Sequence, residues 1–274
     1  MVKQVEEKVA RKRYSSDMSA RDWPQLEPLL VVRRRGKWPL AEVVNAILYV
    51  LKNGCVWRDL PGDLPPWGTV YWYFAQWEAD GTWQRVSTCL NGSSRSEREQ
   101  PGAGRKKAWP TAVILDPQSV KNAATATGAT VGFDAGKLVK GRKRLVLTDT
   151  LGHILASRVL PANAADGPAA IAFWDEVAAT HDLLGQVQVV FVDSSFNGVF
   201  REHLAQRYGI HVEKPAHVLV EKKKFCLHAW RWIVERTLAW LSANRRLSKE
   251  YDRSLRHANA WICLVNIRRI LKFC

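Results

Sequence analysis

The sequence lacks any hydrophobic run long enough to cross a membrane. Its longest apolar stretch, Ala41–Leu51, has only eleven residues and includes Glu42 and Asn45. A membrane-spanning helix needs about 18 or more consecutive apolar residues. We therefore expect a cytoplasmic protein with no membrane partner.

Closely spaced cysteine pairs are missing as well. The five cysteines form no Cys-x-x-Cys pair and stand at Cys55, Cys89, Cys226, Cys263 and Cys274. Most zinc sites use such pairs, and an odd number of cysteines cannot complete a disulfide framework. The spacing argues against both and predicts a protein of a reducing compartment.

Acidic residues are few relative to basic ones. The chain of 274 residues has 41 Lys and Arg against 26 Asp and Glu, which gives a net charge of +15 and a pI near 9.8. So strong an excess implies a polyanionic partner, and we expect nucleic acid. The 13 tryptophans predict core packing, with stacking on bases as the alternative.

The first third of the chain is predicted to be helical. After a flexible tail (1–20), apolar residues recur at helical spacing in four short segments separated by Pro and Gly. The helices are expected to begin near Asp22, Pro39, Thr69 and Thr82. Together they predict a small all-α, helix-turn-helix-like DNA-binding domain over residues 21–90.

The basic residues of this domain gather in one loop, at Arg33, Arg34 and Arg35. The third helix is poor in Lys and Arg and contains Glu78. It is therefore either a recognition helix or packed core, and in the second case the basic loop contacts phosphates instead. Residues 91–110 are rich in Gly, Ser and charge and predict a linker.

Residues 111–274 show a different pattern, in which short apolar strands alternate with helices. Five strands are expected at Ala112–Leu115, Arg144–Thr148, Ile154–Leu160, Val187–Val192 and Ile210–Glu213, with helix from about His228 to the end. This order predicts an α/β core with a mixed five-stranded sheet of the ribonuclease-H-like type. The first three strands form a meander, and helical crossovers add the other two.

Two aspartates follow the most hydrophobic of these strands. Asp116 and Asp193 come directly after the first and the fourth strand, which are neighbours in the predicted sheet. Paired carboxylates suit Mg²⁺, which takes oxygen ligands and bridges to phosphate. The alternative is that each aspartate only caps a turn.

A third carboxylate, Glu235, is expected on the apolar face of a long helix. A carboxylate there is costly unless it is paired or binds a metal. Arg231 lies one turn earlier, so a plain Arg–Glu helix pair is the alternative to a metal ligand.

Five stretches of the chain resemble bacterial insertion-sequence transposases of the DDE class, specifically the IS-five family. The resemblance runs from about Asp22 to Leu271. The stretches are AILYVLKNGCVWRDLPGDLPPWGTVYWYFAQWEADGTW, ILDPQSVKNA, GFDAGKLVKGRKRLVLTDTLGHIL with VLPANAADG, VVFVDSSFNG and WIVERTLAWLSANRRLSKEYDR. The glutamate block with its NRRL tail is highly specific.

The resemblance implies a catalytic triad of Asp116, Asp193 and Glu235 that binds two Mg²⁺ ions, with Mn²⁺ as a substitute. It also places Arg231 in the active site. Two positions differ from the pattern around the glutamate in related transposases, because His228 stands in place of a tyrosine and Ser242 in place of a lysine. Nearby basic residues, Arg245 and Arg246, could supply the missing charge.

The reaction implied is metal-dependent cleavage at the ends of the insertion sequence, followed by attack of the freed 3′-hydroxyl on target DNA. The implied partners are double-stranded DNA, as terminal inverted repeats and target, and a second copy of the chain. The location is the bacterial cytoplasm at the nucleoid. The alternatives are a metal-dependent nuclease without strand transfer and an inactive, transposase-derived DNA-binding protein.

A second basic cluster precedes the second strand and is expected to contact DNA phosphates. It consists of Lys137, Lys140, Arg142, Lys143 and Arg144. The alternative is a solvated charged face. Asp134 and Asp149 lie in the same region and are expected in turns, with Asp149 as the substitute should Asp116 not be catalytic.

Overall fold

The computed structural model describes residues 11–32, 36–97, 109–180, 182–193, 196, 198–214 and 229–273. The basic loop at 33–35 and most of the expected linker therefore lie outside the described residues, as does His228. No helix in the described part of the chain is both long enough and apolar enough to span a membrane.

Four helices form the first third of the fold. They are α1 (Trp23–Leu26, extended by a 3₁₀ turn at Glu27–Leu29), α2 (Leu40–Asn53), α3 (Trp67–Ala79) and α4 (Thr82–Glu97). Gly54 and Gly81 end α2 and α3 with φ of 68° and 73°, a backbone conformation that favours glycine. The buried face of α3 carries Phe74 and Trp77, so packing accounts for much of this helix.

The last of these helices is longer than expected. A helix ending at Leu90 and a linker from residue 91 were predicted, but α4 continues to Glu97. The prediction of a linker is wrong for 91–97, because polar residues there are buried and hydrogen-bonded. Asn91 donates to the carbonyl of Ile154 at 2.9 Å and accepts from the amide of Asn266 at 3.0 Å.

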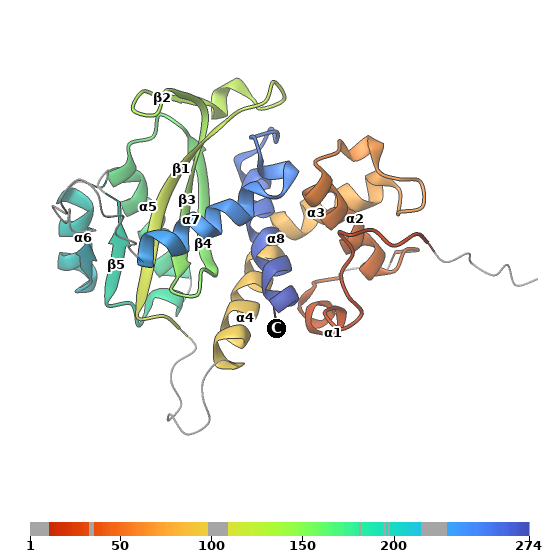
Figure 1. The fold of residues 1–274 in the computed structure, drawn as a ribbon, viewed down its shortest axis with the longest axis horizontal. Coiled ribbons are helices and arrows are strands. Elements are labelled where there is room, and N and C mark those ends of the chain that lie inside the picture. Colours follow the sequence, from red (N-terminus) through yellow and green to blue (C-terminus); the bar gives the residue numbers. More distant parts are fainter. Residues whose placement is uncertain are drawn as a thin grey trace, which may run out of the picture.

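A six-stranded sheet forms the centre of the second part (Figure 1). Its strands are β1 (Ala112–Lys121), β2 (Gly132–Asp134), β3 (Val139–Asp149), β4 (Ile154–Pro161), β5 (Val189–Val192) and β6 (His211–Glu213). β1 and β4 pair antiparallel with β3, and β5 and β6 are added in parallel beyond β1. The predicted meander and crossovers are confirmed.

The number and length of the strands differ from the prediction. β2 is an additional short strand that pairs with the start of β3. β1 and β3 remain paired as far as Lys121 and Gly141, well beyond the apolar residues. Backbone hydrogen bonds carry the ladder through the polar residues, which apolar runs alone could not reveal.

Helices cover both faces of the sheet. α5 (Asp166–Thr180) and α6 (Gly198–Tyr208) pack on one face, around Val113 and Leu115. α7 (Ala229–Ser242) crosses the other face, where Ile233 and Val234 contact Ile114.

The expected continuous C-terminal helix is interrupted. A 3₁₀ turn (Arg245–Leu247) and an irregular segment separate α7 from α8 (Leu255–Phe273). Within this segment, the backbone of Glu250 pairs with the residues at the end of β1 instead of continuing a helix. Its N–H donates to Lys121 at 2.9 Å, and its carbonyl accepts from Ala123 at 2.8 Å.

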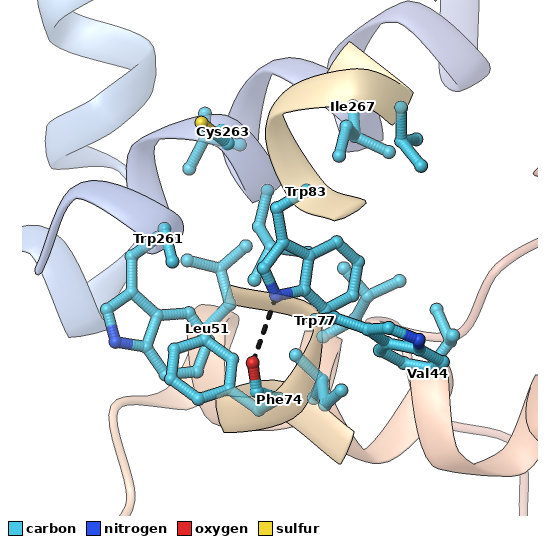
Figure 2. Packing of buried hydrophobic residues seen from close by; sticks show 14 of the residues in the cluster. Val44, Leu51, Phe74, Trp77, Trp83, Trp261, Cys263 and Ile267 are labelled. Carbon is cyan, nitrogen blue, oxygen red and sulfur yellow. Dashed lines mark hydrogen bonds between the residues drawn. The ribbon is translucent and has the colours of Figure 1, made fainter. Parts of the chain in front are cut away.

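The N-terminal helices and the C-terminal helix share one hydrophobic core. α8 lies between the sheet and α1–α3 (Figure 1). Trp261 of α8 stacks on Phe74 of α3 at 4.4 Å, and the indole of Trp83 donates to the carbonyl of Phe74 at 3.2 Å (Figure 2). The prediction that tryptophans pack in the core is confirmed for these buried rings. The N-terminal helices pack against α8 as part of the same core.

Candidate active site

The parallel pairing of β1 and β5 brings two aspartates together. The last paired residues are Leu115 and Val192. Asp116 directly follows Leu115, and Asp193 directly follows Val192. Asp116 was expected to end its strand. Instead, β1 continues to Lys121 through its pairing with β3. Only its pairing with β5 stops there.

Both aspartates belong to the face of the sheet that α7 covers. Side chains alternate between the faces of a strand, so Asp116 shares a face with Ile114, and Asp193 continues the face of Phe191. Ile114 packs against α7, and Phe191 stacks on Trp230 of α7 at 4.5 Å. The two aspartates therefore lie at the edge of the face that α7 covers, and both are partly buried.

α7 supplies the third carboxylate, but not from its buried face. The side chain of Glu235 is 58% exposed, so the expectation that it lies within the apolar stripe is wrong. The buried face of α7 is formed by Ile233, Val234, Thr237 and Leu241, and Glu235 lies beside it. Arg231 donates a hydrogen bond of 2.8 Å to Glu235.

Electrostatic coupling joins these groups into one site. Burial, followed by the negative charges of Asp193 and Glu235, raises the pKa of Asp116 to about 6, while Lys137 and Arg231 act in the opposite direction. A carboxyl with a raised pKa amid other carboxylates is typical of sites that bind a cation or transfer protons.

In the observed arrangement, only two of the three carboxylates are positioned to bind a divalent cation. No three His, Cys, Asp or Glu side chains among the described residues lie close enough together to hold a metal ion. The two aspartates form an oxygen-rich, electronegative pair of the kind that Mg²⁺ prefers. Glu235 must leave Arg231 to join them.

Much of the second basic cluster is structural. Arg142 and Arg144 are 0% and 1% exposed, and both contact the buried carboxylate of Glu250, Arg144 at 2.6 Å. Lys143 is buried with Asp166 on the opposite face. The prediction that these three residues contact DNA is wrong, because both faces of β3 are covered here and all three side chains are buried in ion pairs.

One of the two basic residues after α7 is likewise unavailable to DNA. Arg246 is buried, donates to Asp252 at 2.7 Å and lies over the ring of Trp261 at 5.3 Å. Arg245 is exposed, as are Lys137 and Lys140.

The two other aspartates of this region, Asp134 and Asp149, were expected in turns, but they are the last residues of β2 and β3 and cap the turns that follow. Asp134 accepts from the backbone of Lys137 at 3.0 Å. Asp149 is fully buried, accepts from the backbone of Leu151 and His153, and pairs with Arg95 at 2.6 Å. Asp149 is therefore a structural residue rather than a substitute for Asp116.

Sequence reasoning missed a pocket of about 490 Å³ on the flank of α7. Arg236 lies between Trp232 and Trp240, at 4.3 and 4.7 Å from the ring centres, and Arg269 lies over Trp240 at 4.2 Å. The spacing of four residues between Trp232, Arg236 and Trp240 was the available signal, because such residues share a helix face.

A sequence profile of the transposase DDE domain matches residues 109–270, more than half of the chain. The chain belongs to the DDE transposase family. The N-terminal helices match a second profile, described as a putative transposase of the IS4/5 family, over residues 18–87. A search of curated proteins found no match.

Membership of this family confirms the resemblance and the ribonuclease-H-like fold class. The N-terminal region is all-helical, as expected. The protein is a transposase, an enzyme that acts on DNA, and DDE domains use divalent metal ions.

Proposed function

We propose that this transposase hydrolyses a phosphodiester at each end of an insertion sequence and transfers the freed 3′-hydroxyl into target DNA. Asp116, Asp193 and Glu235 would hold two Mg²⁺ ions, which Mn²⁺ can replace. The observation that carries the proposal is the juxtaposition of Asp116 and Asp193 under α7, with Arg231 and Glu235 coupled to them.

The chemistry consists of two displacements at phosphorus. In the first, a water oxygen forms a bond to phosphorus, the bond to the 3′-oxygen breaks, and the water's proton balances the charge of the leaving oxygen. In the second, the 3′-hydroxyl forms a bond to a target phosphate, and a target 3′-oxygen leaves with a proton. Bound divalent ions would activate the attacking oxygen and neutralise the charge that develops on phosphate.

The protein's own residues would position the substrate and the carboxylates. The side chains of Arg231 and Glu235 are 70% and 58% exposed, so breaking this ion pair costs little free energy. Arg231 would then face the scissile phosphate, for which a guanidinium offers two parallel hydrogen bonds. Glu235 would turn toward the aspartates.

DNA would follow the exposed basic residues around this site. These are Lys137, Lys140 and Arg245, with the pocket of Arg236 and Arg269 on the flank of α7. Phosphate contacts of this kind give affinity without sequence preference. The N-terminal helices would recognise the end, and two copies would assemble on two ends at the nucleoid.

End-labelled linear DNA that carries the genomic flanks of the coding sequence tests the proposal. With Mg²⁺ and the wild-type chain, we expect a nick that leaves a 3′-hydroxyl at the element boundary, and joined products when a plasmid target is added. Asp116→Asn, Asp193→Asn and Glu235→Gln should each abolish both products while DNA binding persists.

The outcomes separate the alternatives. Nicking without joined products would favour a nuclease, and binding without nicking would favour an inactive relative. Asp149→Asn is the matched control, because that carboxylate is structural. At a temperature where this variant is folded, it should retain cleavage.

A further inference from the structure

The tip of the β2–β3 hairpin is fixed against β1 next to the active site. Asp134 accepts a hydrogen bond of 2.5 Å from the hydroxyl of Ser119 on β1, and one of 3.0 Å from the backbone N–H of Lys137. The ammonium of Lys137 donates to the carbonyl of Pro117 at 2.9 Å. These bonds hold the lysine beside the residue that follows Asp116.

The backbone of the tip is strained. Leu138 has φ of 53° and is the one residue other than glycine with positive φ in the part of the chain that the structure describes. Its side chain is 76% exposed, so burial does not offset the strain. Strained residues persist where surrounding bonds hold them and are concentrated at functional sites.

Unlike the buried basic residues that follow it in β3, Lys137 forms no ion pair with a described carboxylate. Arg142 and Arg144 pair with Glu250, and Lys143 pairs with Asp166. Lys137 has a neutral carbonyl as its hydrogen-bond acceptor, and no ion pair with it is present among the described carboxylates. It also acts on Asp116, where its positive charge opposes the effect of burial on the pKa.

We propose that Lys137 is a catalytic residue whose ammonium binds a non-bridging oxygen of the scissile phosphate. The inference rests on the proposed function, and it separates Lys137 from the residues that only hold the DNA backbone. In the displacement, the phosphate oxygens become more negative as the attacking oxygen adds. A fixed ammonium compensates for that charge and keeps its own proton throughout.

The bond to Pro117 does not prevent this role. A lysine has three N–H donors, so the ammonium can bind a phosphate oxygen while one N–H remains on the carbonyl. A charge-assisted bond to phosphate is also stronger than a bond to a neutral acceptor. Lys137 is therefore placed to bind substrate without rearrangement of the hairpin.

Lys137→Met tests the inference, with Lys121→Met as the matched control. Lys121 is also an exposed lysine of this region, at the end of β1, and has no assigned role. Single-turnover cleavage is measured at saturating DNA and Mg²⁺, and DNA affinity is measured by anisotropy without divalent metal. We expect the saturated rate of Lys137→Met to fall about 100-fold, as for loss of one donor to a developing oxyanion.

The affinity of Lys137→Met for DNA should change by less than about 3-fold, because one phosphate contact among several is lost. Lys121→Met should match the wild type in both measurements. If Lys137→Met melts well below the wild type, Lys137→Arg decides, because it keeps the charge. An Arg variant faster than Met supports the inference, and one equally slow overturns it.

The two proposals fail separately. A wild-type chain that cleaves, together with a Lys137→Met variant of unchanged saturated rate, would overturn the role of Lys137 alone. A Lys137→Met variant that loses affinity but not rate would show a backbone contact and overturn it as well. A wild-type chain that does not cleave would overturn the proposed function, and this inference with it.

Discussion

The guanidinium of Arg231 donates a hydrogen bond of 2.8 Å to the carboxylate of Glu235, one turn later in α7. Both side chains are largely exposed, and both charges act on the pKa of Asp116. An exposed pair of this kind is worth about 0–1 kcal/mol. The pair therefore does little to fix the position of Glu235.

The first prediction concerns the partner of Arg231 during the reaction. We expect Arg231→Lys to lower the saturated cleavage rate about 10-fold or more, because an ammonium cannot reproduce a two-point contact with phosphate. The Mn²⁺ concentration at half-maximal cleavage should stay near that of the wild type. A large shift to higher Mn²⁺, with full activity at saturation, would show instead that Arg231 serves to orient Glu235.

The second prediction is a pH-dependent gain in stability from Asp116→Asn without divalent metal. The pKa of Asp116 is raised to about 6 in the folded chain, so the folded wild type binds this proton more tightly than the unfolded chain. Wild-type stability therefore falls as pH rises from about 4 through 6. The variant escapes that loss and should be more stable by up to about 3 kcal/mol at pH 7.5, and by nothing near pH 4.

Thermal melts between pH 4 and pH 8 in EDTA check this. Asp149→Asn provides the contrast of opposite sign, because hydrogen bonds and positive charges from His153 and Arg95 hold the pKa of Asp149 below its usual value, despite burial. That variant should lose stability at neutral pH. A stability difference for Asp116→Asn that does not depend on pH would contradict the prediction.

The third prediction concerns metal binding. Mg²⁺ should raise the melting temperature of the wild type, because a ligand that binds only the folded state stabilises it. The increase should disappear in Asp116→Asn and in Asp193→Asn. Equal increases in the wild type and both variants would place the cation elsewhere.

The fourth prediction is that the carboxylate of Glu250 contributes strongly to the stability of the fold. Glu250→Gln leaves the guanidinium groups of Arg142 and Arg144 buried beside a neutral amide. Loss of one partner from a buried ion pair costs about 3–5 kcal/mol. Urea unfolding should report a loss of this size, while the exposed control Glu213→Gln should change stability by less than about 0.5 kcal/mol.

The fifth prediction tests the shared core. Trp261→Ala should cost about 3–5 kcal/mol, the range for truncation of a buried aromatic ring. Because α8 packs against both the N-terminal helices and the sheet, calorimetry should show one transition at lower temperature. Two transitions, of which only one moves, would show independent domains. Trp72→Ala, at a ring that is 51% exposed, is the control.

The order of strands and helices could be read from the sequence because each strand of the meander and each crossover has its own local signal. The apolar runs at β1, β4 and β5 and the helical periodicity of α2 are examples. The proximity of Asp116 and Asp193 follows from that order, because each comes directly after the paired part of one of two neighbouring parallel strands. Strand order therefore predicts that the two aspartates lie at one edge of the sheet, but it does not predict the exposed position of Glu235 on α7.

The roles of the basic residues were not predictable in the same way. Arg142 and Arg144 look like phosphate contacts until a carboxylate more than 100 residues later, Glu250, is placed against them. Nothing near β3 in the sequence signals that partner. Arg246 and Asp252 are six residues apart, but only the packing of Trp261 shows that the guanidinium is buried.

The sequence by itself determined the class of fold and the family, because these depend on local periodicity, strand order and specific motifs. The three carboxylates of the proposed site stay a prediction from the same motifs. The tertiary structure alone decided which charges face solvent. It also decided that α8 joins the N-terminal helices to the sheet, and that the β2–β3 hairpin brings Lys137 to Pro117. These features depend on contacts between distant segments, whose energies arise from burial and charge pairing that no local pattern contains.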